Sequence, residues 1–209
     1  MANLEEISEK RPAGRPRCDR TRQAIMTAAY ALLLERGLAG FSIEGVAARA
    51  GAAKTTIYRW WPSKGALAVE AFLAAMEPVL PFPDTGSPIA DLKVQLHAFV
   101  RALNGPDGQI LADLIAEGQT HPGTMKAFIA GYLVPRRQYV RSHMAGGIAS
   151  GAIRPDIDLD IALDALFGAI AGRALLWGRP LDEAWVDKLV DTVLHGILAP
   201  RPAGAPAAA

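Results

Sequence analysis

Residues 54–64, KTTIYRWWPSK, gather hydroxyl, cationic and aromatic side chains in one short segment. Hydroxyl groups and lysines suit phosphate oxygens, and an arginine can donate two hydrogen bonds to the base edge of guanine. The segment therefore has the chemistry of nucleic-acid recognition. Lys64 adds a cation where the next helix is expected to begin. The helix dipole disfavours a cation there unless an anion such as a phosphate binds beside it, and a solvated lysine is the alternative.

Two adjacent tryptophans in this segment cannot face the same core, because neighbouring residues of a helix point about 100° apart. In a helix over residues 54–61, Trp61 lies on the same side as Ile57, four residues earlier. We expect this pair to belong to the core. Trp60 then lies at the edge of the exposed face, where it contacts DNA or, alternatively, packs against a neighbouring helix.

Basic residues are concentrated near the N-terminus, although the net charge of the 209-residue chain is only +1. Residues 10–64 contain eleven lysines and arginines against three acidic residues, whereas residues 65–209 contain eleven against fifteen. A basic N-terminal quarter joined to a mildly acidic remainder indicates a module that binds a polyanion. A solvated charged surface would give the same imbalance.

Constellations for catalysis or metal binding are absent from the sequence. The histidines at positions 97, 121, 143 and 195 are widely scattered, and Cys18 is the only cysteine. No Walker loop, nucleophile elbow or dinucleotide fingerprint occurs. The acidic residues at 156–164 lack the glycine and terminal glutamate of an EF-hand and suit a helix start. We therefore expect no enzyme, no metal site and no cofactor.

A membrane location is also not expected, since the sequence has no signal-peptide pattern and no apolar run of about 18 residues. The single cysteine excludes an intramolecular disulfide, which favours the cytoplasm.

Helical periodicity runs through almost the whole chain, which predicts an all-α fold. An amphipathic helix carrying Ile25 and Leu32 ends near Gly37, and Ser42 and Ser63 are suitable N-caps for later helices. Further helices are expected over residues 43–50, 54–61, 64–77, 88–104, 107–120, 122–150 (broken near Pro135), 158–177 and 181–198.

Two short helices hinged at Gly51 and packed on a longer one form a helix-turn-helix, whose second helix enters the major groove. The proline-rich segment 77–88 separates this module from the rest. We predict four parts: a flexible basic arm over residues 1–18, an N-terminal three-helix DNA-binding domain over 19–79 with its helix-turn-helix at 42–61, a C-terminal helical ligand-binding and dimerisation domain over 80–200, and a disordered tail over 201–209.

The segment FSIEGVAARAGAAKTTIYRWWPSKGAL, residues 41–67, resembles the DNA-binding signature of the TetR family of bacterial transcriptional repressors. The resemblance covers about residues 19–79. Ala52 and Ala53 depart from the Val-Ser that is usual at the turn, so the helix over 54–61 lacks a side-chain cap worth about 1 kcal/mol. The resemblance implies that phosphates are bound by Ser42, Tyr58 and Lys64, and that the groove is faced by Lys54, Thr55, Thr56, Arg59 and Trp60.

The sequence GRPR at residues 14–17 resembles a minor-groove arm, in which prolines keep the chain extended and arginines enter a narrow A·T groove. We expect Arg15 and Arg17 to contact DNA in this way. A basic tail that adds only non-specific attraction is the alternative.

Small residues in the helix over 158–177 share one side, which suits close approach of another helix. In this family dimers form through such an intersubunit four-helix bundle, and a dimer suits a palindromic operator. Intramolecular packing is the alternative. The expected dimer residues are Ala165, Gly168, Ala169, Gly172, Trp185, Leu189, Val193 and Ile197.

The resemblance implies an inducer in an apolar cavity among the middle helices, although it does not identify the molecule. The expected function is a homodimeric, ligand-responsive repressor that a small, largely apolar molecule releases from its operator. A constitutive DNA-binding regulator and, less favoured, a helical enzyme are the alternatives. Candidate ligand contacts are Phe99, Leu103, Leu114, Met125, Phe128, Tyr132, Phe167 and Trp177, with His97, Arg101 and Glu117 as polar partners.

Overall fold

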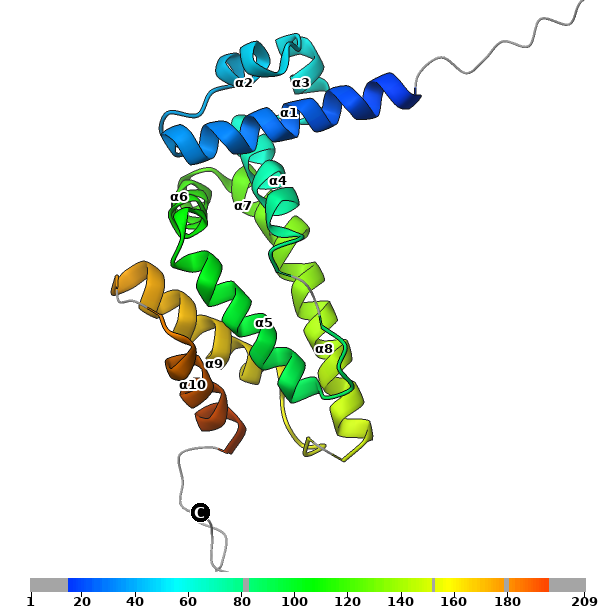
Figure 1. Cartoon of the computed structure of the whole chain (residues 1–209), viewed down its shortest axis with the longest axis vertical. Coiled ribbons are helices and arrows are strands. Elements are labelled where there is room, and N and C mark those ends of the chain that lie inside the picture. Colours follow the sequence, from blue (N-terminus) through cyan, green and yellow to red (C-terminus); the bar gives the residue numbers. More distant parts are fainter. Residues whose placement is uncertain (1–14, 81–82, 152, 179–180, 196–209) are drawn as a thin grey trace, which may run out of the picture.

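A computed structural model describes residues 15–80, 83–151, 153–178 and 181–195, with side chains from residue 19 onwards. All elements in these ranges are helical (Figure 1), as the sequence predicts. They are α1 (Arg15–Arg36), α2 (Ile43–Ala50), α3 (Lys54–Trp60), α4 (Lys64–Met76), α5 (Pro88–Leu103), α6 (Pro106–Thr120), α7 (Pro122–Phe128), η1 (Ile129–Leu133), α8 (Val134–Ala149), α9 (Leu159–Ala171), η2 (Gly172–Leu176) and α10 (Glu183–His195).

Two π-helical turns, η1 and η2, interrupt the helices expected over residues 122–150 and 158–177. The break expected near Pro135 lies at the junction of η1 and α8, where Pro135 is in the first turn of α8. A proline has no N–H to donate and its ring crowds the preceding turn, so a wider π turn before it lets the helix continue.

The N-terminal boundary differs from the predicted arm, because α1 begins at Arg15. Arg15 and Arg17 therefore belong to the first turn of a helix, so residues 15–17 do not form the extended minor-groove arm that the sequence predicts. The physical reason is that Pro16 has no N–H to lose in the first turn, where helical N–H groups have no partner in any case. Residues 1–14 and the predicted tail at 201–209 lie outside the described residues.

The first hydrophobic core joins the DNA-binding module to the middle of the chain. Helix α1 packs against α2 and α4, and the fully buried side chains include Ile25, Val46 and Ile57. This core continues past residue 79 into α6 and α7 through Leu114 and Phe128. The Tyr30 hydroxyl of α1 also donates to Asp107 Oδ1 of α6 at 2.7 Å, and burial followed by this bond raises the pKa of Tyr30. The module is therefore packed directly onto the C-terminal part.

The second hydrophobic core lies among α5, α8, α9 and α10, at the opposite end of the molecule from α1 (Figure 1). Leu96, Ile170 and Val186 are fully buried in it. Phe99 and Leu103 of α5 are half-buried and pack against both cores. The junction between the two cores is thus the place where a change in one can reach the other.

In the part of the chain that the structure describes, none of the helices is both long and apolar enough to span a lipid bilayer.

Candidate nucleic-acid interface and ligand cavity

The turn between α2 and α3 is formed by local signals in the sequence. The Ser42 hydroxyl accepts a hydrogen bond from the Gly45 N–H at 3.1 Å and so caps α2. Gly51 ends α2 with a φ of 62°, a left-handed conformation that glycine adopts without strain. Ala53 precedes α3 and makes no side-chain cap, as expected from the sequence. These signals fix where α2 ends and α3 begins, and α2 packs against both α1 and α3.

Helix α3 has one buried side and one exposed side. Ile57 is fully buried, whereas Thr55, Tyr58 and Arg59 are exposed and Thr56 is half-exposed. The exposed side carries the hydroxyl and guanidinium groups that the sequence assigns to DNA. In Figure 1, α2 and α3 lie above α1, on the side away from the C-terminal helices. A DNA duplex can therefore reach α3.

The two tryptophans have different environments. Trp61 is 2 % exposed, and its Nε1–H donates to Glu70 Oε2 of α4 at 2.6 Å. Arg22 of α1 pairs with the same carboxylate and lies 5.7 Å from the centre of a Trp61 ring. Trp60 is half-buried, meets Trp61 edge-on at 5.5 Å, and carries the Arg59 guanidinium 5.3 Å from its ring centre. Trp60 thus packs on its own domain while part of it stays at the edge of the exposed face.

Lys54 is ion-paired in the free protein. Its Nζ lies 3.1 Å from Glu44 Oε1 at the start of α2, and both side chains are exposed. The backbone N–H of Glu44 itself and then the Lys54 ammonium lower the pKa of the Glu44 carboxyl. Exposed pairs are weak because water screens them, so a phosphate can compete for this lysine.

Lys64 is the first residue of α4, directly after its cap Ser63, whose hydroxyl accepts from the Ala66 N–H at 3.1 Å. The first turn of α4 has no acidic residue. The N-terminal end of this helix therefore combines its positive dipole end with an ammonium group, which suits a phosphate.

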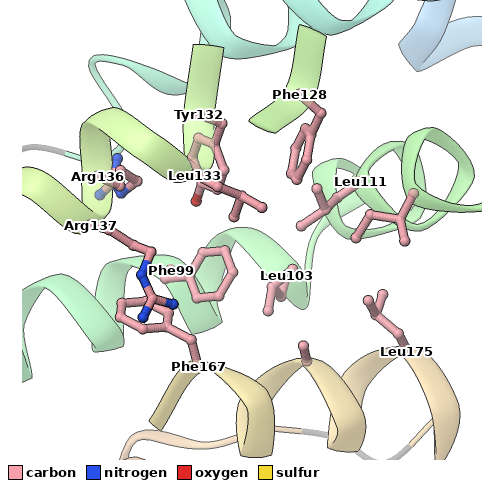
Figure 2. A pocket seen from close by; sticks show the side chains of 12 residues that line it. Phe99, Leu103, Leu111, Phe128, Tyr132, Leu133, Arg136, Arg137, Phe167 and Leu175 are labelled. Atoms are coloured by element: carbon pink, nitrogen blue, oxygen red, sulfur yellow. The ribbon is translucent and has the colours of Figure 1, made fainter. Parts of the chain in front are cut away.

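An apolar cavity of about 170 Å³ lies where the two cores meet. Figure 2 shows side chains converging on it from α5, α6, η1, α8 and α9. The ring centres of Phe99 and Phe167 are 6.1 Å apart, and those of Phe128 and Tyr132 are 5.3 Å apart. Its lining consists of Phe99, Leu103, Leu111, Ile115, Phe128, Tyr132, Leu133, Arg136, Arg137, Phe167, Ala171 and Leu175.

Five of the predicted ligand residues line this cavity: Phe99, Leu103, Phe128, Tyr132 and Phe167. The others have different surroundings. Leu114 is buried in the first core, and Met125 packs at 2.8 Å from the position a Gly118 Cβ would occupy. His97 contacts Asp187 and Arg101 pairs with Glu183, both on α10.

Glu117 and Trp177 are also placed away from the cavity. Glu117 lies 3.4 Å from His121, the residue directly after α6, and Trp177 is 68 % exposed beyond the end of η2. The helical pattern identified the correct helices, but it could not tell which side of each faces the cavity.

Sequence reasoning missed the residues that the π turns bring to the cavity. Leu133 ends η1 and Leu175 belongs to η2, so both positions depend on the extra residue of a π turn. Arg136 and Arg137 follow η1. Arg137 is ion-paired with Asp160 and Asp164 of α9, and Arg136 donates to the Leu80 carbonyl after α4 at 3.3 Å. Burial lowers the pKa of Arg136.

A second group of polar residues, also missed from the sequence, lies at the bend between α4 and α5. Asp84, Asp91 and His143 each place one potential ligand atom within 4.8 Å of the others. His143 is distant in sequence from the two aspartates, and the packing of α5 against α8 brings it to them.

Two family models match the chain. "Bacterial regulatory proteins, tetR family" matches residues 25–71, and "Tetracyclin repressor-like, C-terminal domain" matches residues 82–193. The chain belongs to the TetR family of transcriptional regulators. By family and fold it is a DNA-binding regulator with a helix-turn-helix, and not an enzyme.

Curated and solved relatives of this TetR regulator agree with the assignment. It is 33 % identical to the HTH-type transcriptional regulator YdeS of Bacillus subtilis over 89 % of this chain and 94 % of YdeS. It is 30 % identical to the DNA-binding transcriptional repressor TetR of Mycobacteroides abscessus over 85 % and 93 % of the two chains. The crystal structure of the TetR family regulator SCO0332 superposes with a TM-score of 0.77 at 39 % identity, covering 86 % of this chain and all of that one.

The predicted dimer residues of this TetR regulator fall into two groups. Ala165 and Gly168 of α9 are exposed, and a Cβ on Gly168 or Gly172 would meet nothing within 4 Å. The glycines therefore serve no close packing within the described part of the chain. In contrast, Trp185, Leu189 and Val193 of α10 are half-buried against the second core. Ala169 is half-buried, and Ile197 lies outside the described residues.

Proposed function

We propose that this TetR regulator is a cytoplasmic, homodimeric repressor that binds a palindromic operator and is released from it by a small, largely apolar molecule. The cavity of about 170 Å³ at the junction of the two cores supports this function above all. A constitutive regulator would be expected to fill that space with side chains, because protein interiors are close-packed.

The size of the cavity limits the class of ligand. An engineered cavity of about 150 Å³ in another protein binds benzene, so this one suits a molecule of one or two rings or a short chain. Four aromatic side chains line it, and Tyr132 adds one hydroxyl, which stays protonated because burial raises its pKa. We therefore infer an uncharged, largely apolar ligand with one group that can hydrogen-bond to Tyr132.

An acyl-CoA ligand fits this cavity poorly. FadR from Thermus thermophilus, solved with lauroyl-CoA, superposes with a TM-score of 0.67 but is only 21 % identical, over 90 % of this chain and all of that one. The similarity at that identity concerns the fold. A coenzyme A thioester is several times larger than a one-ring molecule, so only part of it could occupy a space of about 170 Å³.

Contacts between the cavity helices and α4 offer a route from ligand to DNA. Helix α7 continues into η1, which lines the cavity, and α7 also packs on the start of α4 at Gly65 and Thr124. Arg136 bonds the carbonyl of Leu80 just after α4. The ligand can change operator binding only if it prefers the conformation that does not fit DNA. A shift of α4 would move Lys64 and α3 together.

Exposed apolar side chains on α9 and η2 support the homodimer. Ile161 of α9, Leu176 at the end of η2 and Trp177 directly after it are exposed, as are Ala165 and Gly168 of α9. Exposed apolar residues that are contiguous on a surface mark interaction sites. Pairing α9 and η2 with their copies would form the expected bundle and space the two α3 helices for a palindrome.

The proposed DNA contacts are tested by salt-dependent binding to DNA from immediately upstream of the gene. Lys64→Ala and Tyr58→Phe are expected to weaken binding to all DNA sequences, because each removes a phosphate contact. For Lys64→Ala, the slope of log affinity against log salt concentration should become shallower by about 1. Arg59→Ala is expected to relax base preference at a cost of about 1–3 kcal/mol. Lys126→Ala on α7 is the matched control. Unchanged operator affinity in all three variants would remove this interface.

Filling the cavity is expected to make repression insensitive to ligand. Ala171→Leu adds three carbons to the lining beside η2, so the variant should bind operator normally but no longer be released by one-ring apolar compounds that release the wild type. Ala130→Leu, on the exposed side of η1, is the control and should respond normally. Fluorescence anisotropy of operator DNA with a panel of aromatic compounds measures both. Equal release of the two variants would exclude the cavity as the ligand site.

A further inference from the structure

The bend between α4 and α5 contains a buried carboxylate. Asp91, in the first turn of α5, is 4 % exposed. The backbone N–H of Thr85 donates to it at 3.1 Å and the Thr85 hydroxyl at 2.7 Å. These bonds fold the bend back over α5, and the Thr85 N–H also lies 3.2 Å from the second carboxylate oxygen, Oδ2. Oδ2 also faces His143 of α8.

Two further groups face Asp91. His143 of α8 places its Nε2 at 3.9 Å from Asp91 Oδ2, which is too far for a hydrogen bond. Asp84 of the bend completes a set in which one ligand atom of each residue lies within 4.8 Å of the others. The Tyr139 ring stacks on the His143 ring, with their centres 4.3 Å apart. The Tyr139 hydroxyl lies 3.1 Å from His143 Nε2 and 3.3 Å from the Pro83 carbonyl oxygen. The imidazole is thus held in place beside two carboxylates. An ion bound at Nε2 would replace its contact with the Tyr139 hydroxyl, which can still donate to the Pro83 carbonyl.

Gln95 is an independent sign that something occupies this place. It lies one turn after Asp91 on α5 and is 3 % exposed, and its buried Nε2 has no hydrogen-bond partner. Gln95, Asp91 and His143 line the same small cavity of about 10 Å³, which is room for one water-sized particle. Buried amides are normally satisfied, so an unpaired one points to a missing partner. Because the amide nitrogen and oxygen are interchangeable by rotation, Gln95 can turn its Oε1 to that partner.

We propose that Asp84, Asp91, His143 and Gln95 bind one divalent transition-metal ion of the zinc class. Two carboxylates and an amide oxygen alone would suit magnesium or calcium, but an imidazole favours zinc and its neighbours. Four protein ligands match the coordination number of zinc. The ligand atoms must contract around the ion, and the exposed Asp84 on the bend is free to approach. The ion would neutralise the two carboxylates, satisfy Gln95 and fasten the bend to α5 and α8.

Titration of the full-length protein with zinc tests the site. After chelator treatment, the wild type is expected to bind one Zn²⁺ per chain by calorimetry, and its Tm should rise on binding. Asp84→Asn and His143→Gln are each expected to weaken that binding at least tenfold, since each removes one ligand. The controls Asp156→Asn and His121→Gln change exposed residues elsewhere and should leave affinity unchanged.

Failure of the wild type to bind zinc would overturn the proposal and leave a buried water as the partner of Gln95. Binding that survives both Asp84→Asn and His143→Gln would place the metal on other surface groups and overturn it equally.

Gln95→Met tests the fourth ligand, because methionine has a similar shape but no amide. The metal-free variant should keep or raise its Tm, since it loses an unsatisfied polar group. Its zinc affinity should fall severalfold. Unchanged zinc affinity would overturn the assignment of Gln95 as a ligand.

Discussion

Trp61→Ala will lower the free energy of unfolding by about 3–5 kcal/mol, the usual cost of removing a large aromatic side chain from a core. Trp61 is 2 % exposed and lies beside fully buried Ile57, so its removal leaves a cavity between α3 and α4. The change also removes the Nε1–H that donates to Glu70 and the ring beneath Arg22. Three contacts that hold α3 in place disappear together.

The neighbouring tryptophan provides the matched control. Trp60 is half-buried, so Trp60→Ala should cost clearly less than Trp61→Ala in stability. Its operator affinity should fall, because the ring supports Arg59 on the DNA side. Urea unfolding followed by circular dichroism, at several protein concentrations, measures the stability of both variants. Equal losses of stability would show that Trp60 belongs to the core as fully as Trp61.

Trp61→Phe separates the hydrogen bond from the burial. The phenyl ring fills most of the space but leaves Glu70 without the indole donor, so a loss smaller than that of Trp61→Ala is expected.

Local sequence signals were sufficient for the helix-turn-helix. Ser42 has an oxygen that caps α2, Gly51 adopts the left-handed conformation that ends it, and Pro62 with Ser63 separates α3 from α4. Each of these effects acts within about four residues. The spacing of Ile57 and Trp61 then determined which side of α3 is buried. Such features can be predicted from sequence because they depend on residues close together in the chain and not on distant helices.

The cavity and the polar cluster depend on how distant helices cross. A π turn shifts the direction of every later side chain in its helix. The periodicity of residues 129–133 does not predict such a turn. Leu133 and Arg137 therefore came to the cavity unexpectedly. His143 approaches Asp91 only because α8 packs along α5. The same applies to the start of α1, where Pro16 is compatible with an extended arm and with a first helical turn.

Gly65→Ala is expected to disturb both stability and the communication between cavity and DNA. A Cβ on Gly65 would lie 1.9 Å from Thr124 Oγ1 of α7 and 3.0 Å from its Cβ. Thr124 is 2 % exposed, so it has little room to move, and rotation of its side chain would leave the Cβ contact. The start of α4 must therefore move away from α7, at a cost of about 1–3 kcal/mol. Since Lys64 precedes Gly65, operator affinity should fall as well.

A second substitution distinguishes this contact from a general defect. Thr124→Ala removes Oγ1 and Cγ2, so the double variant should recover much of the stability and operator affinity lost in Gly65→Ala, with a coupling energy of about 0.5–3 kcal/mol. Gly123→Ala, one residue before Thr124 on α7, is the control, because a Cβ there meets nothing within 4 Å and alanine favours a helix. If Gly65→Ala still released operator at the wild-type ligand concentration and bound it with unchanged affinity, the contact between α4 and α7 would not carry the signal. A variant that binds operator weakly and no longer responds to ligand, rescued by Thr124→Ala, would identify this contact as the connection between the cavity and the DNA-binding helices.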